Sequence, residues 1–285
     1  MSNIPQDILT LNVFGRDRAG AVARFTSFLF STGANIEALS ERVTRGQFVM
    51  TVVASWLAGK MNRLQLEASL RAIGRELGMD VEFRYGTPGR IPRMAILVTR
   101  ETHCAKAVLE GVRRGVLKCK PVLMGGNLNL LRPLAKRYRL PFFCTGYGNR
   151  DTAEKRLLAE LSRREVDFIV LARFMRILSP GFVWRYRNRI INIHPSLLPS
   201  FPGAAPYRQA LERGVKFIGA TAHFADESLD GGPIIAQDGF RMGRGEKFSS
   251  IVKRGREIEA RVLVEGVRVF LTRKLDVHWG RVFVE

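Results

Sequence analysis

Cysteine is scarce in this chain, which has Cys104, Cys119 and Cys144 among its 285 residues. Three scattered cysteines without a Cys-x-x-Cys pair argue against a disulfide framework and against the usual spacing of zinc ligands. No stretch reaches about 18 uninterrupted apolar residues, so no transmembrane helix is expected. The beginning of the chain also lacks the charged-then-apolar layout of a signal peptide. These absences predict a soluble, cytoplasmic protein with reduced thiols and no membrane partner.

Acidic residues are also few, with 26 Asp and Glu against 46 Lys and Arg, which gives a formal net charge of +20. Residues 1–90 hold 11 basic and 8 acidic residues (+3), and residues 91–285 hold 35 and 18 (+17). Such an excess indicates an anionic partner or a solvated, arginine-rich surface. Because the basic residues form only short clusters, we expect no nucleic acid partner.

Two patterns divide the chain. Strands are predicted over 8–14, 36–44, 47–56 and 79–85, with helices over 21–31 and 61–77. This βαββαβ order favours a small sheet with two helices on one face, in a domain over 6–86. The turn-rich segment 86–92 is the predicted linker.

The remainder, 93–285, alternates strands with helices, which predicts an α/β domain with a doubly wound, mostly parallel sheet. Strands are expected over 94–99, 118–124, 142–143, 168–172, 190–194, 217–224, 233–241 and 277–284, and helices over 104–114, 128–138, 151–164, 181–186, 207–213 and 249–271. Ligands of such sheets bind outside the carboxyl ends of the strands.

Two polar side chains stand at the end of one predicted strand. Asn192 and His194 are two residues apart, so strand geometry places them on the same face. Pro195 and Pro199 follow and stiffen the loop. An amide donor and an imidazole would then lie together at the ligand-binding rim. A capping asparagine and a histidine satisfied in a turn would fit the same residues.

A second polar stretch follows the next strand. Asp230 precedes a Gly-Gly-Pro turn, and His223 lies in the strand before it. Asp230 could equally be an ordinary acidic turn residue, and His223 a buried structural histidine.

Three segments together resemble the formyltetrahydrofolate-dependent formyltransferase superfamily. They read LARFMRILSP at 171–180, NIHPSLLPSFPG at 192–203 and GATAHFADESLDGGPII at 219–235. Residues 8–85 look like an ACT domain, which has the ferredoxin-like βαββαβ fold. An ACT domain before this catalytic domain, with the similar segment 98–104, is the layout of the formyltetrahydrofolate deformylase family.

The resemblance implies hydrolysis of 10-formyltetrahydrofolate to tetrahydrofolate and formate. Carried over residue by residue, it makes Asn192, His194 and Asp230 the catalytic residues. Folate-binding residues are implied at Met175, Arg176, Ile177, Leu178, His223, Ala225 and Asp226, with Arg176 near the glutamate tail of the folate.

Formamide hydrolysis suits these residue types. Asn192 can donate a hydrogen bond to the oxygen that becomes negative, and His194 can stabilise that oxygen or protonate the leaving nitrogen. Asp230 can hold the water and accept its proton. No metal or other cofactor is required, and none is expected.

Transfer of the formyl group to an amine, such as that of glycinamide ribonucleotide, is the alternative. The segment 99–104 has no glycine and carries Glu101 where a phosphate-binding loop would be needed, which argues against a phosphorylated acceptor. Pro195 instead favours transfer, because many deformylases have a second histidine at this position.

Transfer to methionyl-tRNA would need a larger C-terminal domain than the residues after Phe240 provide. A non-catalytic folate or amino-acid sensor is a further alternative, which the three catalytic-type residues together oppose.

The ACT resemblance also implies a homo-oligomer and a possible amino-acid effector. Asn35, after the first predicted helix, is a candidate effector contact, although an asparagine at this place more often simply ends the helix.

Overall fold

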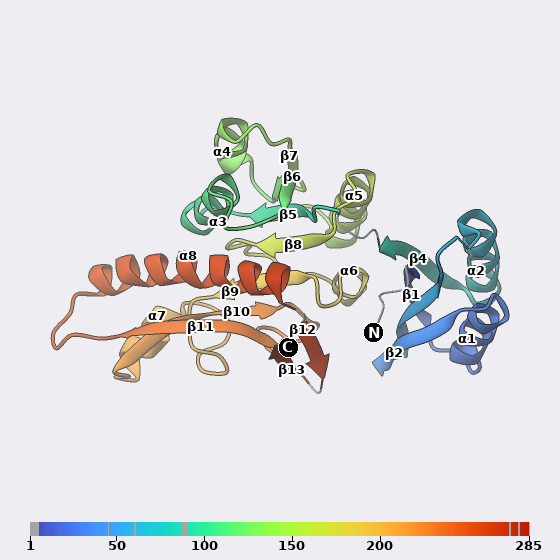
Figure 1. Ribbon diagram of the computed structural model, residues 1–285. Helices are drawn as coiled ribbons and strands as arrows, with labels where there is room; N and C mark the ends of the chain where they lie inside the picture. The colour runs from blue at the N-terminus through green and yellow to red at the C-terminus, as the bar shows by residue number, and fades with distance from the viewer. Residues whose placement is uncertain are drawn as a thin grey trace. The chain divides into compact units, whose positions relative to one another are not determined.

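The computed structural model describes residues 6–44, 46–59, 61–86, 90–273, 275–278 and 280–284. The chain divides into two compact units, Met1–Arg90 and Ile91–Glu285 (Figure 1). Part of the predicted linker, residues 87–89, lies outside the described residues.

The N-terminal unit has the expected βαββαβ order. Its elements are β1 (Gln6–Arg16), α1 (Ala21–Ser31), β2 (Asn35–Thr44), β3 (Gln47–Leu57), α2 (Arg63–Leu77) and β4 (Met79–Gly86). The strands form an antiparallel sheet in the order β2-β3-β1-β4. Alternate residues of β1, Leu9, Leu11 and Val13, are fully buried against the core that Phe25 of α1 and Leu70 of α2 share. Because alternate side chains of a strand share one face, that face of the sheet packs against both helices.

Asn35 is the first residue of β2 and not the end of α1. The helix ends at Ser31, and Gly33 follows with a φ of 79°, a left-handed conformation that glycine adopts without strain. The Asn35 side chain donates a hydrogen bond to Glu37 Oε1 at 2.8 Å.

The C-terminal unit is built on a seven-stranded sheet in the order β11-β10-β9-β8-β5-β6-β7 (Figure 1). The strands are β5 (Arg93–Val98), β6 (Lys120–Gly126), β7 (Phe142–Cys144), β8 (Phe168–Leu171), β9 (Ile190–His194), β10 (Phe217–Phe224) and β11 (Ile234–Arg241). Strands β5 to β9 pair in parallel, whereas β10 runs antiparallel to both β9 and β11. The mostly parallel α/β fold is therefore confirmed.

Helices cover both faces of this sheet. They are α3 (His103–Arg113), α4 (Arg132–Arg137) after the short 3-10 turn η1 (Asn129–Leu131), α5 (Arg150–Arg163), α6 (Pro180–Arg185), α7 (Pro206–Glu212) and α8 (Phe248–Thr272). Ile96 and Val98 of β5 join one hydrophobic core, and Ala95 and Leu97 join the other. From Met94 to Val98 this central strand is apolar, because both of its faces are buried.

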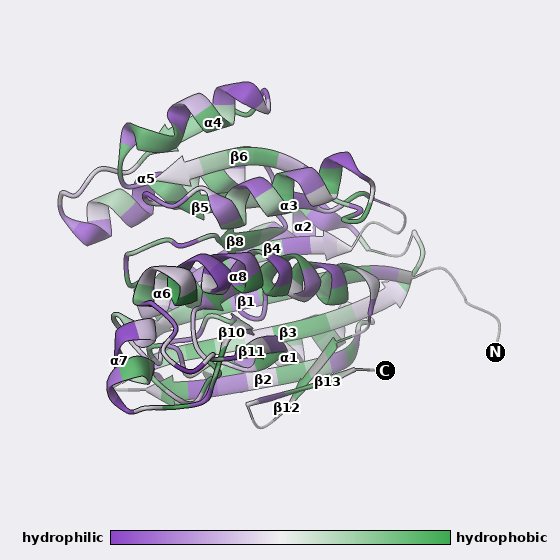
Figure 2. Ribbon diagram, turned by 90° about the vertical axis from the view of Figure 1, so that its left-hand side faces the viewer, coloured by the Kyte–Doolittle hydropathy of each residue, from purple (hydrophilic) through white to green (hydrophobic). Residues whose placement is uncertain are grey.

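The long helix α8 is amphipathic, with green and purple segments alternating along it (Figure 2). Its buried positions include Ile258, Val262 and Leu263, which belong to the core beside β9 and β10. Within the described part of the chain, no helix is both long and apolar enough to cross a membrane.

The sequence prediction for residues 277–284 was wrong. One strand was expected there, but the structure has an antiparallel hairpin of β12 (Leu275–His278) and β13 (Arg281–Val284). Gly280 lies between the strands with a φ of 72°, and this left-handed residue permits the tight reversal.

Candidate active site

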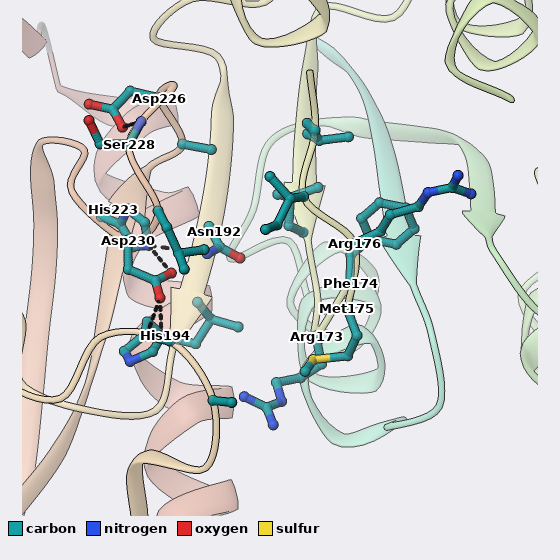
Figure 3. Close-up of a pocket in the computed structure, with 18 of the residues that line it drawn as sticks. Arg173, Phe174, Met175, Arg176, Asn192, His194, His223, Asp226, Ser228 and Asp230 are labelled. Carbon is teal, nitrogen blue, oxygen red and sulfur yellow. Dashed lines mark hydrogen bonds and ion pairs between the residues drawn. The ribbon is translucent and has the colours of Figure 1, made fainter. Parts of the chain in front are cut away.

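A cavity of about 330 Å³ lies where β8 and β9 end, and the segments after β8, β9 and β10 line it. Every residue that the sequence placed at the site lines this cavity: Asn192, His194, Asp230, Met175, Arg176, Ile177, Leu178, His223, Ala225 and Asp226. Its position at the carboxyl ends of parallel strands is the expected one for this fold. Figure 3 shows the polar groups converging from β9 and from the segment that follows β10.

Strand pairing fixes the position of Asn192. It lies opposite His223 in the antiparallel pairing of β9 with β10, and Asn192 Nδ2 is 3.1 Å from His223 Nε2. The other ring nitrogen, Nδ1, is 2.9 Å from the Phe224 carbonyl, which can only accept a hydrogen bond. Nε2 of the neutral ring therefore accepts a hydrogen from the Asn192 amide and orients it.

Burial keeps the His223 ring neutral. Removal from water lowers the pKa of His223 to about 4, against smaller raising effects of the Phe224 carbonyl and Asp230. The sequence indicated this residue as a substrate contact. Both of its ring nitrogens have protein partners, so it can also position Asn192.

His194 and Asp230 form the second polar pair. His194 Nδ1 lies 3.1 Å from Asp230 Oδ2, and His194 Nε2 lies 2.9 Å from the Phe201 carbonyl. Oδ2 of Asp230 also accepts a hydrogen bond from the Gly203 N–H at 2.9 Å. The other oxygen, Oδ1, is 3.9 Å from His223 Nε2 and hydrogen-bonds to none of the described residues.

The carboxyl of Asp230 is held in its ionised form. Burial raises its pKa, but the hydrogen bonds from His194 and the Gly203 N–H outweigh burial and bring the pKa below its ordinary value. Asp230 thus presents one engaged and one unengaged carboxylate oxygen to the cavity.

The backbone around Asp230 is constrained. Asp230 itself has a φ of 54°, which aspartate tolerates better than most residues. A Cβ atom on Gly232 would lie 1.8 Å from the Phe224 carbonyl oxygen, so no other residue fits there. The Gly-Gly turn therefore lets the segment after β10 fold back and bring Asp230 to His194.

A buried hydroxyl secures the loop after His194. Thr221 Oγ1 donates to the Ser196 carbonyl and accepts hydrogen bonds from the Leu198 N–H and from Gln237 Nε2. These bonds tie the loop to β10 and β11. The loop geometry is therefore set by the sheet as well as by its prolines.

The segment after β8 forms the opposite wall. The Met175 N–H donates to Thr99 Oγ1, and the buried Glu154 accepts hydrogen bonds from both the backbone and the hydroxyl of Ser179. Met175 and Ile177 are each 63% exposed, which is unusual for large apolar side chains. They give this wall an apolar surface for a ring system.

Arg176 lines the cavity, and its guanidinium donates hydrogen bonds to the carbonyls of Gly146 and Gly148. The sequence did not reveal this anchoring role. Neither did it reveal Arg173, which also lines the cavity and lies beside Glu259 of α8.

In the part of the chain that the structure describes, one group could hold a metal ion: His103, Cys104 and Glu259. The sequence gave no sign of it, because Glu259 comes from a distant helix. Burial, followed by the Glu259 charge, raises the pKa of the Cys104 thiol, and Glu259 already has Arg173 as a cationic partner. This group therefore fits a metal poorly.

Comparison with known proteins agrees with this architecture. Residues 92–267 match the formyl transferase family model, and residues 7–84 match an ACT domain model. The formyltetrahydrofolate deformylase of Bacillus subtilis is 35% identical over 274 residues, covering 94% of this chain and 90% of that protein.

Solved structures give the same result. A crystal structure of a formyltetrahydrofolate deformylase from Pseudomonas syringae has a TM-score of 0.67 and 31% identity, covering 98% of this chain and 94% of that one. A glycinamide ribonucleotide transformylase from Symbiobacterium toebii, with a TM-score of 0.66 and 31% identity, covers 69% of this chain and 95% of its own. With both domains matched and such relatives over nearly its whole length, the chain belongs to the formyltetrahydrofolate deformylase family.

Proposed function

We propose that the protein hydrolyses 10-formyltetrahydrofolate to tetrahydrofolate and formate, with Asn192, His194 and Asp230 as the catalytic residues. The observation that carries this proposal is the unengaged Oδ1 of an ionised Asp230 in the same cavity as an oriented amide donor. A water held by a carboxylate, beside a donor for an oxyanion, is the arrangement that hydrolysis of an amide requires.

Asp230 acts as the base. Its Oδ1 accepts a proton from water while the water oxygen bonds to the formyl carbon. The proton then passes to the folate N10 as the carbon–nitrogen bond breaks. A positioned acid–base group of this kind typically contributes about 10²–10⁴-fold in rate.

Asn192 stabilises the negative oxygen of the tetrahedral intermediate. One amide hydrogen is donated to His223, which leaves the second for the substrate. Loss of one such donor costs about 2.7–4 kcal/mol in comparable acyl-transfer enzymes.

His194 acts through Asp230. Its Nε2 lies within hydrogen-bond distance of the Phe201 carbonyl, and its Nδ1 faces Asp230. The ring therefore holds the carboxylate in place and stabilises its negative charge. The proposed steps use no metal and no other cofactor.

The folate occupies the rest of the cavity. The exposed apolar side chains of Met175 and Ile177, with Leu178, contact the ring system. The pterin ring lies on the side of the cavity that Ala225, Asp226 and His223 line. Arg176, anchored on two carbonyls, lies toward the glutamate tail, where an arginine pairs well with a carboxylate.

Water is favoured over an amine acceptor. The deformylase relatives match both units, whereas the transformylase from Symbiobacterium toebii covers 69% of the chain. Glu101, in the segment where a phosphorylated acceptor would bind, is already paired with Arg256. A phosphate placed there would meet a carboxylate.

The test is incubation of the purified enzyme with 10-formyltetrahydrofolate and no amine. We expect one formate per tetrahydrofolate formed. Activity that appears only when glycinamide ribonucleotide is added would replace hydrolysis with transfer.

The ACT domain supports two further proposals: assembly into a homo-oligomer and binding of an amino-acid effector, with Asn35 as a candidate contact. Sedimentation and equilibrium dialysis test these directly. We also propose that the protein works in the cytoplasm, since its three cysteines are unpaired, as in reducing compartments.

A further inference from the structure

Arg173 is a half-buried cation in the wall of the active-site cavity. The proposed mechanism gives this residue no role. Arg173 lies two residues after the end of β8, has a φ of 62° and lines the same cavity as Asn192 and His194. Its side chain is 22% exposed. Figure 3 shows the guanidinium extending from its own loop toward the His194 side of the cavity.

The guanidinium is anchored from behind. Arg173 Nε lies 3.4 Å from Glu259 Oε2, an ion pair without hydrogen-bond alignment, and Nε has no acceptor within the described ranges. An arginine normally satisfies several of its five donors. Its two terminal nitrogens hydrogen-bond to none of the described residues, and Arg173 lines the cavity, so a ligand there can reach them.

Glu259 is itself held rigidly. Tyr207 of α7 and His103 of α3 both hydrogen-bond to its carboxylate, which is 1% exposed. Burial raises the pKa of Glu259, but the His103 hydrogen bond and the Arg173 charge outweigh it, so the pKa falls below its ordinary value. Residues of α3 and α7 therefore hold Glu259 of α8 in place, and Glu259 is the ion-pair partner of Arg173.

The reaction supplies a ligand of matching chemistry. Attack of water on a neutral formamide forms a carbon–oxygen bond, breaks the carbon–nitrogen bond and yields a neutral amine, formate and a proton. Formate is a planar monoanion, and a guanidinium binds a carboxylate with two parallel hydrogen bonds. It is also released beside Asp230, whose negative charge repels it.

We propose that Arg173 is the binding residue for formate, the anionic product. This inference rests on the proposed function and deepens it. Glu259, His103 and Tyr207 are positioning residues for Arg173. The Glu259 carboxylate orients the guanidinium, and the His103 imidazole and the Tyr207 phenol orient Glu259. None of the three contacts the formate.

The test measures binding of ¹³C-labelled formate to the resting enzyme by NMR titration, without turnover. The Arg173→Met variant should raise the dissociation constant at least ten-fold, and Arg173→Lys, which keeps the charge but loses the planar fork, should give an intermediate rise. Arg256→Met is the matched control, because it removes a charge from α8 outside the cavity. It should bind formate as the wild type does.

Equal formate affinity in Arg173→Met and the wild type would overturn the proposal, and would leave Arg173 as a counter-charge for Glu259. If Arg173→Met does not fold, phenylglyoxal modification of the wild-type enzyme decides the matter. Formate should slow modification of Arg173 and leave that of Arg256 unchanged. No protection of Arg173 would refute formate binding there.

These outcomes are separable from the proposed function. An enzyme that releases no formate from 10-formyltetrahydrofolate refutes the hydrolysis, whatever the titration shows. An enzyme that hydrolyses its substrate but binds formate independently of Arg173 refutes only this inference.

Discussion

Nδ1 of His194 lies 3.1 Å from Oδ2 of Asp230, and this contact joins the end of β9 to the turn before β11. A hydrogen bond at this distance needs one proton between the two atoms, carried by the ring while the carboxylate is ionised. The contact leaves Oδ1 of Asp230 available to a water, so it couples His194 to the carboxylate that activates the water.

Asp230→Asn should reduce kcat by about 10²–10⁴-fold, because an amide cannot accept the proton of the water. Folate affinity should change little, since the cavity keeps its shape. Formate release and folate binding by calorimetry measure the two effects separately.

Asp238→Asn is the matched control for this variant. Asp238 is an exposed residue of β11 that pairs with Arg261, away from the cavity lining. Its turnover should equal that of the wild type. Undiminished turnover in Asp230→Asn would remove this carboxylate from the mechanism.

His223 should make the stability of the C-terminal unit depend on pH. Its folded-state pKa of about 4 lies below its ordinary value of 6.5, so the unfolded chain binds more protons between these values. The contribution of neutral His223 is complete above pH 6.5 and is lost as the pH falls through 4. At its full size this contribution to the free energy of unfolding is about 3 kcal/mol.

Urea unfolding at several pH values between 7 and 4 measures this dependence. The His223→Gln variant, which does not titrate, should show a flatter dependence over the same range. An unchanged slope in the variant would show that other groups cause the acid sensitivity.

Gly232→Ala should disrupt the turn that delivers Asp230. The added methyl would overlap the Phe224 carbonyl oxygen, and relief would require β10 or the turn to move. We expect a loss of stability of about 1–3 kcal/mol or more, together with a large loss of turnover.

Gly243→Ala serves as the control, because a Cβ atom there would make only ordinary contacts, the nearest with Glu246 Oε2 at 3.5 Å, and the backbone has no left-handed φ. Thermal unfolding and formate release compare the two variants. Normal turnover in Gly232→Ala would mean that the placement of Asp230 does not depend on this close approach.

Much of the fold could be predicted from the sequence, because its elements have strong local signals. The strands over 190–194 and 217–224 were predicted with the bounds that the structure shows, since apolar runs end there at polar or turn residues. The final hairpin was missed because its two strands are only four residues each, and only two residues, Trp279 and Gly280, separate them in the sequence.

The site was predictable only in part. The period of two put Asn192 and His194 on one face, and motif resemblance added Asp230. The role of His223 depends on its antiparallel register opposite Asn192, which no local pattern gives. The Arg173 and Glu259 pair joins the end of β8 to α8, so only the folded chain reveals it.

The most direct test of hydrolysis is the reaction in water enriched in ¹⁸O, without any amine, followed by mass spectrometry of the formate. If Asp230 activates water against the formyl carbon, each formate carries one oxygen from the solvent and one from the substrate. Formate without solvent oxygen, or no formate until an amine is supplied, would contradict the account.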